Sequence, residues 1–269
     1  MADALARAKV ALDQGRASEA EQIVRAVLNK DSRNAAAQQL LGGALLLQER
    51  HEEAIEPLEG AARVLRDPAL DTQLAIALRE TGRNEDALSR LKRAVKREPP
   101  YAFAFHELGF LLYSLRRYDE AIAAIRRGIE IAPFASNLWV LVGSICHARR
   151  DLPGAHAAYA RALSISPHLA SAHYGMGTVL MSQAGYAQAA EHFRIASINA
   201  PGDLQARLKL AGCLLEIGQT DAALASLRTA VRSGPQHAYA MSLKLMLSSG
   251  QGRFWLRPSA AARALTSDG

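Results

Sequence analysis

Apolar and polar positions follow a helical period along most of the chain, and one pattern of them returns every 34 residues. The segment 105–133, FHELGFLLYSLRRYDEAIAAIRRGIEIAP, carries apolar residues three or four positions apart and ends in proline. A shift of 34 residues gives WVLVGSICHARRDLPGAHAAYARALSISP, and a second shift gives HYGMGTVLMSQAGYAQAAEHFRIASINAP. This spacing predicts two amphipathic helices per copy, joined by a short turn.

The copies share small residues at two positions. In one register they span residues 1–34, 35–67, 68–101, 102–135, 136–169, 170–203 and 204–237, the second copy being one residue shorter. Position 20 of the repeat is Ala in all seven copies, and position 8 is always Gly or Ala. Helices approach closely only where side chains are small, so these positions predict where the first helix of each repeat (helix A) crosses the second (helix B).

This pattern resembles the tetratricopeptide repeat, in which an L-G pair is followed by A-x₃-F and then by Ala and Pro. The resemblance covers residues 1–237 and implies an all-α fold, a right-handed α-solenoid of seven helix-turn-helix repeats. It also implies that helices A line the concave surface and helices B the convex one. Residues 238–249 are predicted to form a capping helix, and residues 250–269 are a tail outside the repeats.

Glycine and proline mark the ends of the predicted helices. Turn glycines are expected at Gly15, Gly82 and Gly218. Prolines near the repeat ends should stop helix B; they are Pro99, Pro133, Pro167, Pro201 and Pro235. Pro153 falls in the first turn of a helix B, where its missing N–H costs nothing, whereas Pro57 lies inside one and predicts a slight kink.

Composition and charge argue against several classes of function. The net charge is +6, but the basic residues are scattered among Glu and Asp, so nucleic-acid binding is not expected. The N-terminal stretch lacks the apolar segment of a signal peptide, and no apolar run is long enough to cross a membrane. Arg outnumbers Lys, as in GC-rich bacterial genomes, and the expected location is the bacterial cytoplasm. Cys146 and Cys213 are expected to be buried free thiols.

The sequence holds no catalytic motif, so we expect neither an enzyme nor a cofactor. His173 takes a core position, and His51 begins a helix B. Four other histidines are expected in solvent: His156, His168, His192 and His237. His106 and His147 should face the groove, but two histidines without a carboxylate or thiol partner do not predict a metal site. The basic pairs at 92–93, 96–97 and 126–127 are expected on the solvated convex face, with a weak patch for an acidic partner as the alternative.

The resemblance places the groove at positions 2, 5, 9 and 12 of each helix A. The residues predicted to bind a partner there are Phe103, His106, Phe110, Tyr113, Asn137, Val140, Ser144, His147, Tyr174, Thr178, Met181 and Tyr239. This set lacks the basic carboxylate clamp of chaperone-type repeats. Its aromatics favour a peptide or protein with an apolar segment, although some of the rings could instead pack against neighbouring helices.

The expected function is therefore a non-catalytic scaffold or adaptor. The alternative is a substrate-presenting arm that works with a separate glycosyltransferase or sulfotransferase. The tail segment 253–259, RFWLRPS, fits no repeat, and its Phe-Trp-Leu cluster needs apolar surroundings. Three destinations are open to it: the edge of the capping helix, a groove of its own or a second copy (and so self-association), or an external partner.

Overall fold

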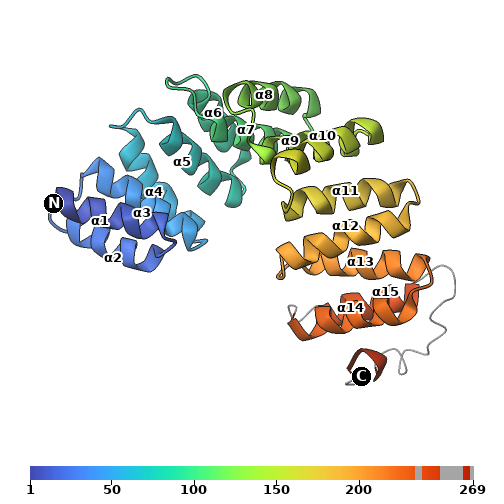
Figure 1. Cartoon of the computed structure of the whole chain (residues 1–269). Helices are drawn as coiled ribbons and strands as arrows, with labels where there is room; N and C mark the ends of the chain where they lie inside the picture. The colour runs from blue at the N-terminus through green and yellow to red at the C-terminus, as the bar shows by residue number, and fades with distance from the viewer. Residues whose placement is uncertain (234–237, 249–262, 267–269) are drawn as a thin grey trace. The chain divides into compact units, whose positions relative to one another are not determined.

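The computed structural model describes residues 1–233, 238–248 and 263–266 of the chain. Within these ranges all regular structure is helical, so the all-α class is confirmed (Figure 1). The helices are α1 (Ala2–Asp13), α2 (Ala17–Leu28), α3 (Ala35–Leu47), α4 (His51–Ala62), α5 (Pro68–Glu80), α6 (Asn84–Ala94), α7 (Ala102–Ser114), α8 (Tyr118–Ile131), α9 (Ser136–Ala148), α10 (Leu152–Ile165), α11 (Ala170–Ser182), α12 (Tyr186–Asn199), α13 (Leu204–Glu216), α14 (Thr220–Ser233) and α15 (Ala238–Ser248).

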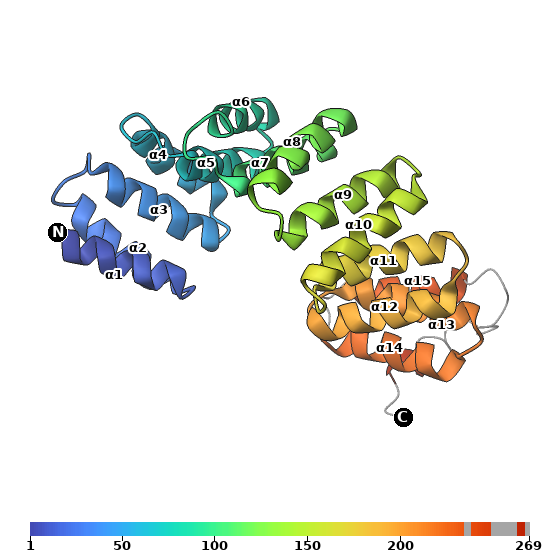
Figure 2. The ribbon, with the colours of Figure 1, turned by 45° about the horizontal axis from the view of Figure 1, so that its top comes forward.

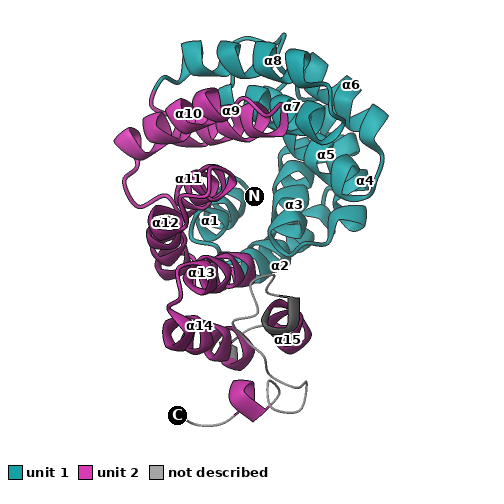
Figure 3. Ribbon diagram, turned by 90° about the vertical axis from the view of Figure 1, so that its right-hand side faces the viewer, with its two compact units in different colours: residues 1–133 teal, residues 134–269 magenta. Residues whose placement is uncertain are grey.

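The chain divides into two compact units, residues 1–133 and residues 134–269 (Figure 3). In unit 1 each helix A contacts the next one, from α1 to α3, α5 and α7. Helices α2, α4 and α6 each pack between their own helix A and the following one, and α8 packs on α7. Helices A therefore share one surface of unit 1, and helices B cover the other. In unit 2 α10 packs between α9 and α11, α12 packs between α11 and α13, and α15 packs on α13 and α14 (Figure 2).

Every helix A ends in the same turn, with a left-handed residue at position 15 of the repeat. Three of these residues are the predicted glycines Gly15, Gly82 and Gly218, with φ of 72°, 80° and 80°. The other four are not glycine: Glu49, Arg116, Arg150 and Ala184. In each turn the next amide donates back to the carbonyl five residues earlier, as from Arg83 N to Leu78 O at 2.8 Å. This bond ends helix A and reverses the chain toward helix B.

The small residues lie where the two helices of a repeat cross, as predicted. All seven alanines at position 20 have no exposed surface. At Gly42 a Cβ atom would lie 2.3 Å from the Leu58 side chain, and at Gly143 it would lie 2.7 Å from Tyr159. A larger residue at these positions would push the paired helices apart.

Proline behaves as expected at the ends of most helices B. Helices α8, α10 and α12 end two residues before Pro133, Pro167 and Pro201. Pro153 lies in the first turn of α10, which Asp151 caps by accepting from the Gly154 amide at 2.9 Å. Helix α4 continues through its internal proline, Pro57. Pro235 lies outside the described residues.

The basic pairs of the third repeat are only partly solvated, because both of their arginines pair with a buried carboxylate. Asp71 on α5 is 1% exposed and accepts from Arg93 and from Arg97 Nε, the latter at 2.6 Å. A buried carboxylate needs such partners, so these arginines tie α6 and the residues after it to α5. The lysines beside them, Lys92 and Lys96, are exposed.

The histidines divide between the core and solvent. His173 is buried, as predicted, and its Nε2 lies 2.9 Å from Pro167 O. Its Nδ1 lies 2.9 Å from Nδ1 of His192, which is half-buried, so the expectation of a solvated His192 is wrong. Burial and then His173 lower the pKa of His192. His156 and His168 are exposed, and His237 lies outside the described residues.

Residues 263–266 pack against the other helices of unit 2. Residues 263–266 form a helical turn in which Leu265 is 2% exposed and joins the core cluster that contains Leu227. Arg228 Nε on α14 donates to Ala264 O at 2.7 Å. The segment 253–259 lies outside the described residues.

Both cysteines are free, and burial raises the pKa of Cys213 to about 11.

Candidate functional site

The residues predicted to form the groove fall on both units. Helix α7 of unit 1 carries Phe103, His106, Phe110 and Tyr113. The others lie on α9, α11 and α15 of unit 2. The structure thus presents two sets, each on the helices A of its own unit.

The rings on α7 are partly packed and partly open. Phe103 and Phe110 are each 39% exposed, which is high for phenylalanine. Phe103 stacks on His106 with ring centroids 5.7 Å apart and planes 8° apart. Tyr113 is half-buried against Tyr118 of α8. Two apolar rings therefore remain available on this surface.

A buried carboxylate holds this surface together. Glu107 on α7 is buried, and its Oε2 lies 3.2 Å from Arg79 Nη1 of α5. Its Oε1 lies 2.9 Å from His106 Nδ1. The guanidinium of Arg79 in turn lies over the Phe110 ring. Glu107 thus holds the side chain that contacts each exposed ring: His106 for Phe103 and Arg79 for Phe110.

Arg79 and Glu107 lie outside the set of binding residues predicted from the sequence. Arg79 stands at position 12 of its repeat, which is a groove position, so the same register could have found it. Glu107 stands in an otherwise apolar stretch of α7, and an unpaired charge there is itself a signal.

Tyr101, just before α7, connects this surface to the preceding repeat. Its ring meets Phe103 edge to face at a centroid distance of 6.0 Å. Burial, and then the charges of Asp67 and Glu107, raise the pKa of the Tyr101 hydroxyl. The Tyr101 hydroxyl therefore stays protonated at neutral pH.

Most polar groups of the predicted residues of unit 2 form hydrogen bonds within the unit. Ser144 Oγ lies 3.1 Å from both Val140 O and Tyr159 OH. Thr178 donates to Tyr174 O at 2.9 Å, and His147 Nε2 lies 3.4 Å from Ser182 Oγ. Tyr174, Met181 and Tyr239 pack against the core cluster of α12 to α14, whereas Asn137 is exposed.

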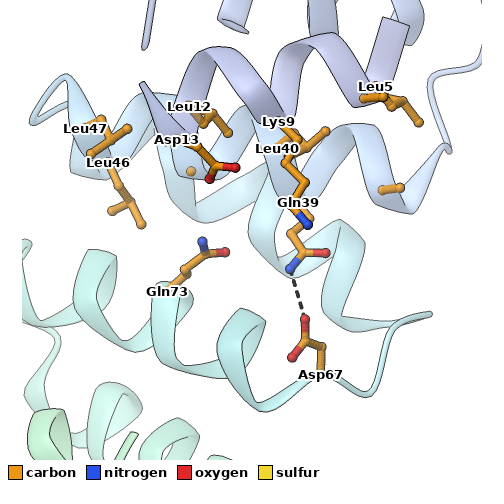
Figure 4. Close-up of a pocket in the computed structure, with 13 residues that line it drawn as sticks. Leu5, Lys9, Leu12, Asp13, Gln39, Leu40, Leu46, Leu47, Asp67 and Gln73 are labelled. Carbon is orange, nitrogen blue, oxygen red and sulfur yellow. Dashed lines mark hydrogen bonds between the residues drawn. The ribbon is translucent and has the colours of Figure 1, made fainter. Parts of the chain in front are cut away.

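A cavity of about 700 Å³ lies between α1, α3 and α5 of unit 1 (Figure 4). Its lining residues are Leu5, Ala6, Lys9, Leu12, Asp13, Ala36, Gln39, Leu40, Gly43, Leu46, Leu47, Asp67 and Gln73. The predicted set of groove residues starts at the fourth repeat and therefore does not include this cavity. The same positions 2, 5, 9 and 12 in the first two repeats identify Leu5, Lys9, Leu12, Ala36, Gln39, Gly43 and Leu46.

Five leucine side chains line the cavity, and several polar groups stand among them. Gln39 Nε2 donates to Asp67 Oδ2 at 3.1 Å, and Asp67 Oδ1 accepts from the Ala69 amide at 2.9 Å. Gln73 Oε1 is buried and has no hydrogen-bond partner. Lys9 and Asp13 stand one turn apart on α1, and both are exposed.

Two searches of the described residues bear on other kinds of site. Residues 1–233, 238–248 and 263–266 contain no group of three or more His, Cys, Asp or Glu placed to hold a metal ion. Within the same ranges, no helix has the length and apolar character needed to cross a membrane.

Comparison with solved structures shows the same fold in several proteins. A chain of the APC/C hetero-tetramer Cut9–Hcn1 aligns with a TM-score of 0.75 at 14% identity, over 90% of this chain and 48% of that one. The present chain thus spans about half the length of that relative. A tetratricopeptide repeat protein from Parabacteroides merdae aligns with a TM-score of 0.71 at 15% identity, over 91% of this chain and 98% of that one. Pseudomonas aeruginosa pilF aligns with a TM-score of 0.65 at 16% identity, over 84% and 96%.

Sequence comparison identifies the family. No match was found among curated proteins. The tetratricopeptide repeat profile matches residues 5–67, 72–136, 106–170 and 174–238, which together are most of the chain. The chain therefore belongs to the tetratricopeptide repeat family, whose repeats form scaffolds for protein interaction.

Proposed function

We propose that this protein is a non-catalytic scaffold that binds an apolar segment of a partner protein on the helix A surface of unit 1. The observation that carries the proposal is the pair of exposed rings, Phe103 and Phe110, on α7. Exposed aromatic side chains on a groove position are typical anchors of protein interfaces.

The surroundings of the two rings favour binding. Phe103 stacks on His106 and meets Tyr101 edge to face, and the guanidinium of Arg79 lies over the Phe110 ring. Rings that are already held lose little conformational freedom when a partner covers them. A segment placed on this surface would therefore gain apolar contact at low entropic cost.

The charges on the same surface are neutralised by one another. Arg79 pairs with Glu107 and Glu80, the latter at 2.8 Å. Arg79 is therefore already paired and is poorly suited to bind a carboxylate of the partner. Apolar contact with a few hydrogen bonds fits this surface better. The predicted residues of unit 2, among them the exposed Asn137, are proposed as a second and more polar contact region.

The test compares captured proteins quantitatively. The full chain, the double variant Phe103→Ala/Phe110→Ala and the control Phe134→Ala are used as bait in a lysate of the source organism. Phe134 is 77% exposed and lies outside the helices, so its variant removes an exposed ring elsewhere. The proposal expects partners of the wild type to be lost by the double variant and kept by the control. Equal capture by all three baits contradicts it.

A further inference from the structure

We propose that the cavity between α1, α3 and α5 is a specificity pocket for one apolar side chain of the partner, flanked in the partner sequence by Lys or Arg. This inference rests on the proposed function, because it names which segment the helix A surface selects. It concerns residues of the first three repeats, whereas the exposed rings belong to the fourth.

The pocket exists because position 43 has no side chain. Gly43 stands at position 9 of its repeat, where the fourth repeat places Phe110. A Cβ atom at Gly43 would lie 3.6 Å from Gln73 Nε2 and 3.7 Å from Leu12 Cδ1. A longer side chain there would extend into the space that the cavity occupies. The surface of unit 1 therefore has a hollow on α3 and a ridge of rings on α7.

The wall of the pocket suits an aliphatic or aromatic side chain. Leu5, Leu12, Leu40 and Leu46 line it, and the exposed Leu47 stands with them. A volume of about 700 Å³ is in the range of ligand pockets and can hold a side chain together with the backbone that carries it. Filling it removes the leucine surface from water.

One polar group of the pocket can accept a hydrogen bond from the ligand. Gln73 Oε1 is a buried acceptor without a partner, and buried acceptors are rarely left so. Figure 4 shows the side chains of Gln73, Gln39, Leu12 and Asp13 around a common space. The backbone N–H of an extended peptide is the donor that would accompany an inserted side chain.

The negative charge of the pocket favours a Lys or Arg next to the inserted side chain of the partner. Two carboxylates, Asp13 and Asp67, line it against one ammonium group, Lys9. Both oxygens of Asp67 already accept hydrogen bonds, whereas Asp13 makes no ion pair within the part of the chain that the structure describes. Asp13 is exposed on the α1 side of the pocket and can receive the guanidinium or ammonium group of the partner.

The experiment is a selection of random twelve-residue peptides, displayed on phage, against the full chain. The proposal expects the enriched peptides to share Leu, Ile, Phe or Trp next to Lys or Arg. Their affinities are then measured by fluorescence anisotropy for the wild type and for Gly43→Leu, which fills the pocket. The matched control is Gly212→Leu, the same change at the same position of the seventh repeat, where a Cβ atom meets only Leu245 at 4.0 Å.

Gly43→Leu should weaken binding by about tenfold or more, and Gly212→Leu should leave it unchanged. Asp13→Asn should weaken binding to a smaller extent, and Gln73→Leu should weaken binding while raising the melting temperature, a combination that loss of folding cannot produce. If the peptides lose affinity for Phe103→Ala/Phe110→Ala but bind Gly43→Leu like the wild type, the pocket proposal is wrong and the proposed function stands. If no peptide is enriched, or if acidic peptides are enriched, the pocket proposal is also wrong.

Discussion

The guanidinium carbon of Arg79 lies 4.6 Å from the centroid of the Phe110 ring, and the same guanidinium is bound by the buried carboxylate of Glu107. One acidic side chain of α7 therefore supports, through Arg79 of α5, the orientation of an exposed ring on its own helix. This arrangement ties the stability of the α5–α7 contact to the shape of the proposed binding surface.

Removing this carboxylate should weaken both folding and binding. Glu107→Ala leaves the partly buried Arg79 without its buried counter-charge and should lower the free energy of unfolding by about 1–3 kcal/mol. Urea unfolding followed by circular dichroism measures the change. The exposed carboxylate Glu120, which pairs with Arg117, is the control, and Glu120→Ala should cost less than about 1 kcal/mol. Equal costs for the two variants would show that Glu107 has no special role.

The cluster around Asp71 should dominate the stability of the third repeat. Asp71→Ala deletes a buried acceptor of two arginines, Arg93 and Arg97, and should destabilise the protein by about 2–4 kcal/mol. Asp86, which forms an exposed pair with Arg83, provides the comparison. Asp86→Ala should cost less than about 1 kcal/mol in the same urea measurement. A small effect of Asp71→Ala would mean that the cluster is solvated after all.

The left-handed turns offer a stabilising change. Ala184 has a φ of 60°, which strains any residue with a Cβ atom. Ala184→Gly should therefore raise the free energy of unfolding by about 0.5–1 kcal/mol, in spite of the greater freedom of glycine in the unfolded chain. The reverse change, Gly82→Ala, should lower it by a similar amount. The melting temperatures of both variants test this prediction. A lower melting temperature for Ala184→Gly would show that Ala184 is not strained.

Stability should fall as the pH is lowered through the histidine range. The folded pKa of His192 lies below its ordinary value, so the folded state binds fewer protons there than the unfolded chain. The stability that His192 contributes is fully present above its unfolded pKa of about 6.5, and it is lost as the pH falls toward the folded pKa. Melting temperatures measured between pH 8 and pH 5 should therefore fall. His192→Gln should flatten this dependence, and an unchanged slope in that variant would exclude His192 as its source.

The C-terminal turn should protect the end of unit 2. Leu265→Ala removes a buried side chain from the cluster formed with α14 and should increase hydrogen exchange in α13 to α15. Thr266→Ala, an exposed change in the same turn, is the control. If exchange in these helices is the same in both variants, the turn contributes nothing to the last repeat.

Most of the fold could be predicted because it depends on local residue size. The alanines at position 20 and the glycines at position 8 are visible in the sequence and act where two helices touch. The left-handed residues Glu49 and Ala184 could not be predicted, because the turn between the paired helices imposes this conformation on whatever residue stands there. Nor could the pairing of His173 with His192, because each alone reads as an ordinary core or surface residue.

The candidate site was predicted less completely. The groove rule identified Phe103 and Phe110, whose exposure follows from their place on helix A. The pocket beside Gly43 depends on what three helices together leave unfilled, and no single helix carries that information. The buried Asp71 looks like a surface charge in the sequence until Arg93 and Arg97 are placed beside it.

Site-specific photo-crosslinking tests the central claim most directly. A benzoylphenylalanine is placed at position 110 or, as the control, at position 134, and the full chain is irradiated in a lysate of the source organism. The account predicts a discrete crosslinked partner at position 110 that is absent at position 134 and is competed away by unlabelled wild-type protein. The same crosslinked partners at both positions, or none at position 110, would contradict it.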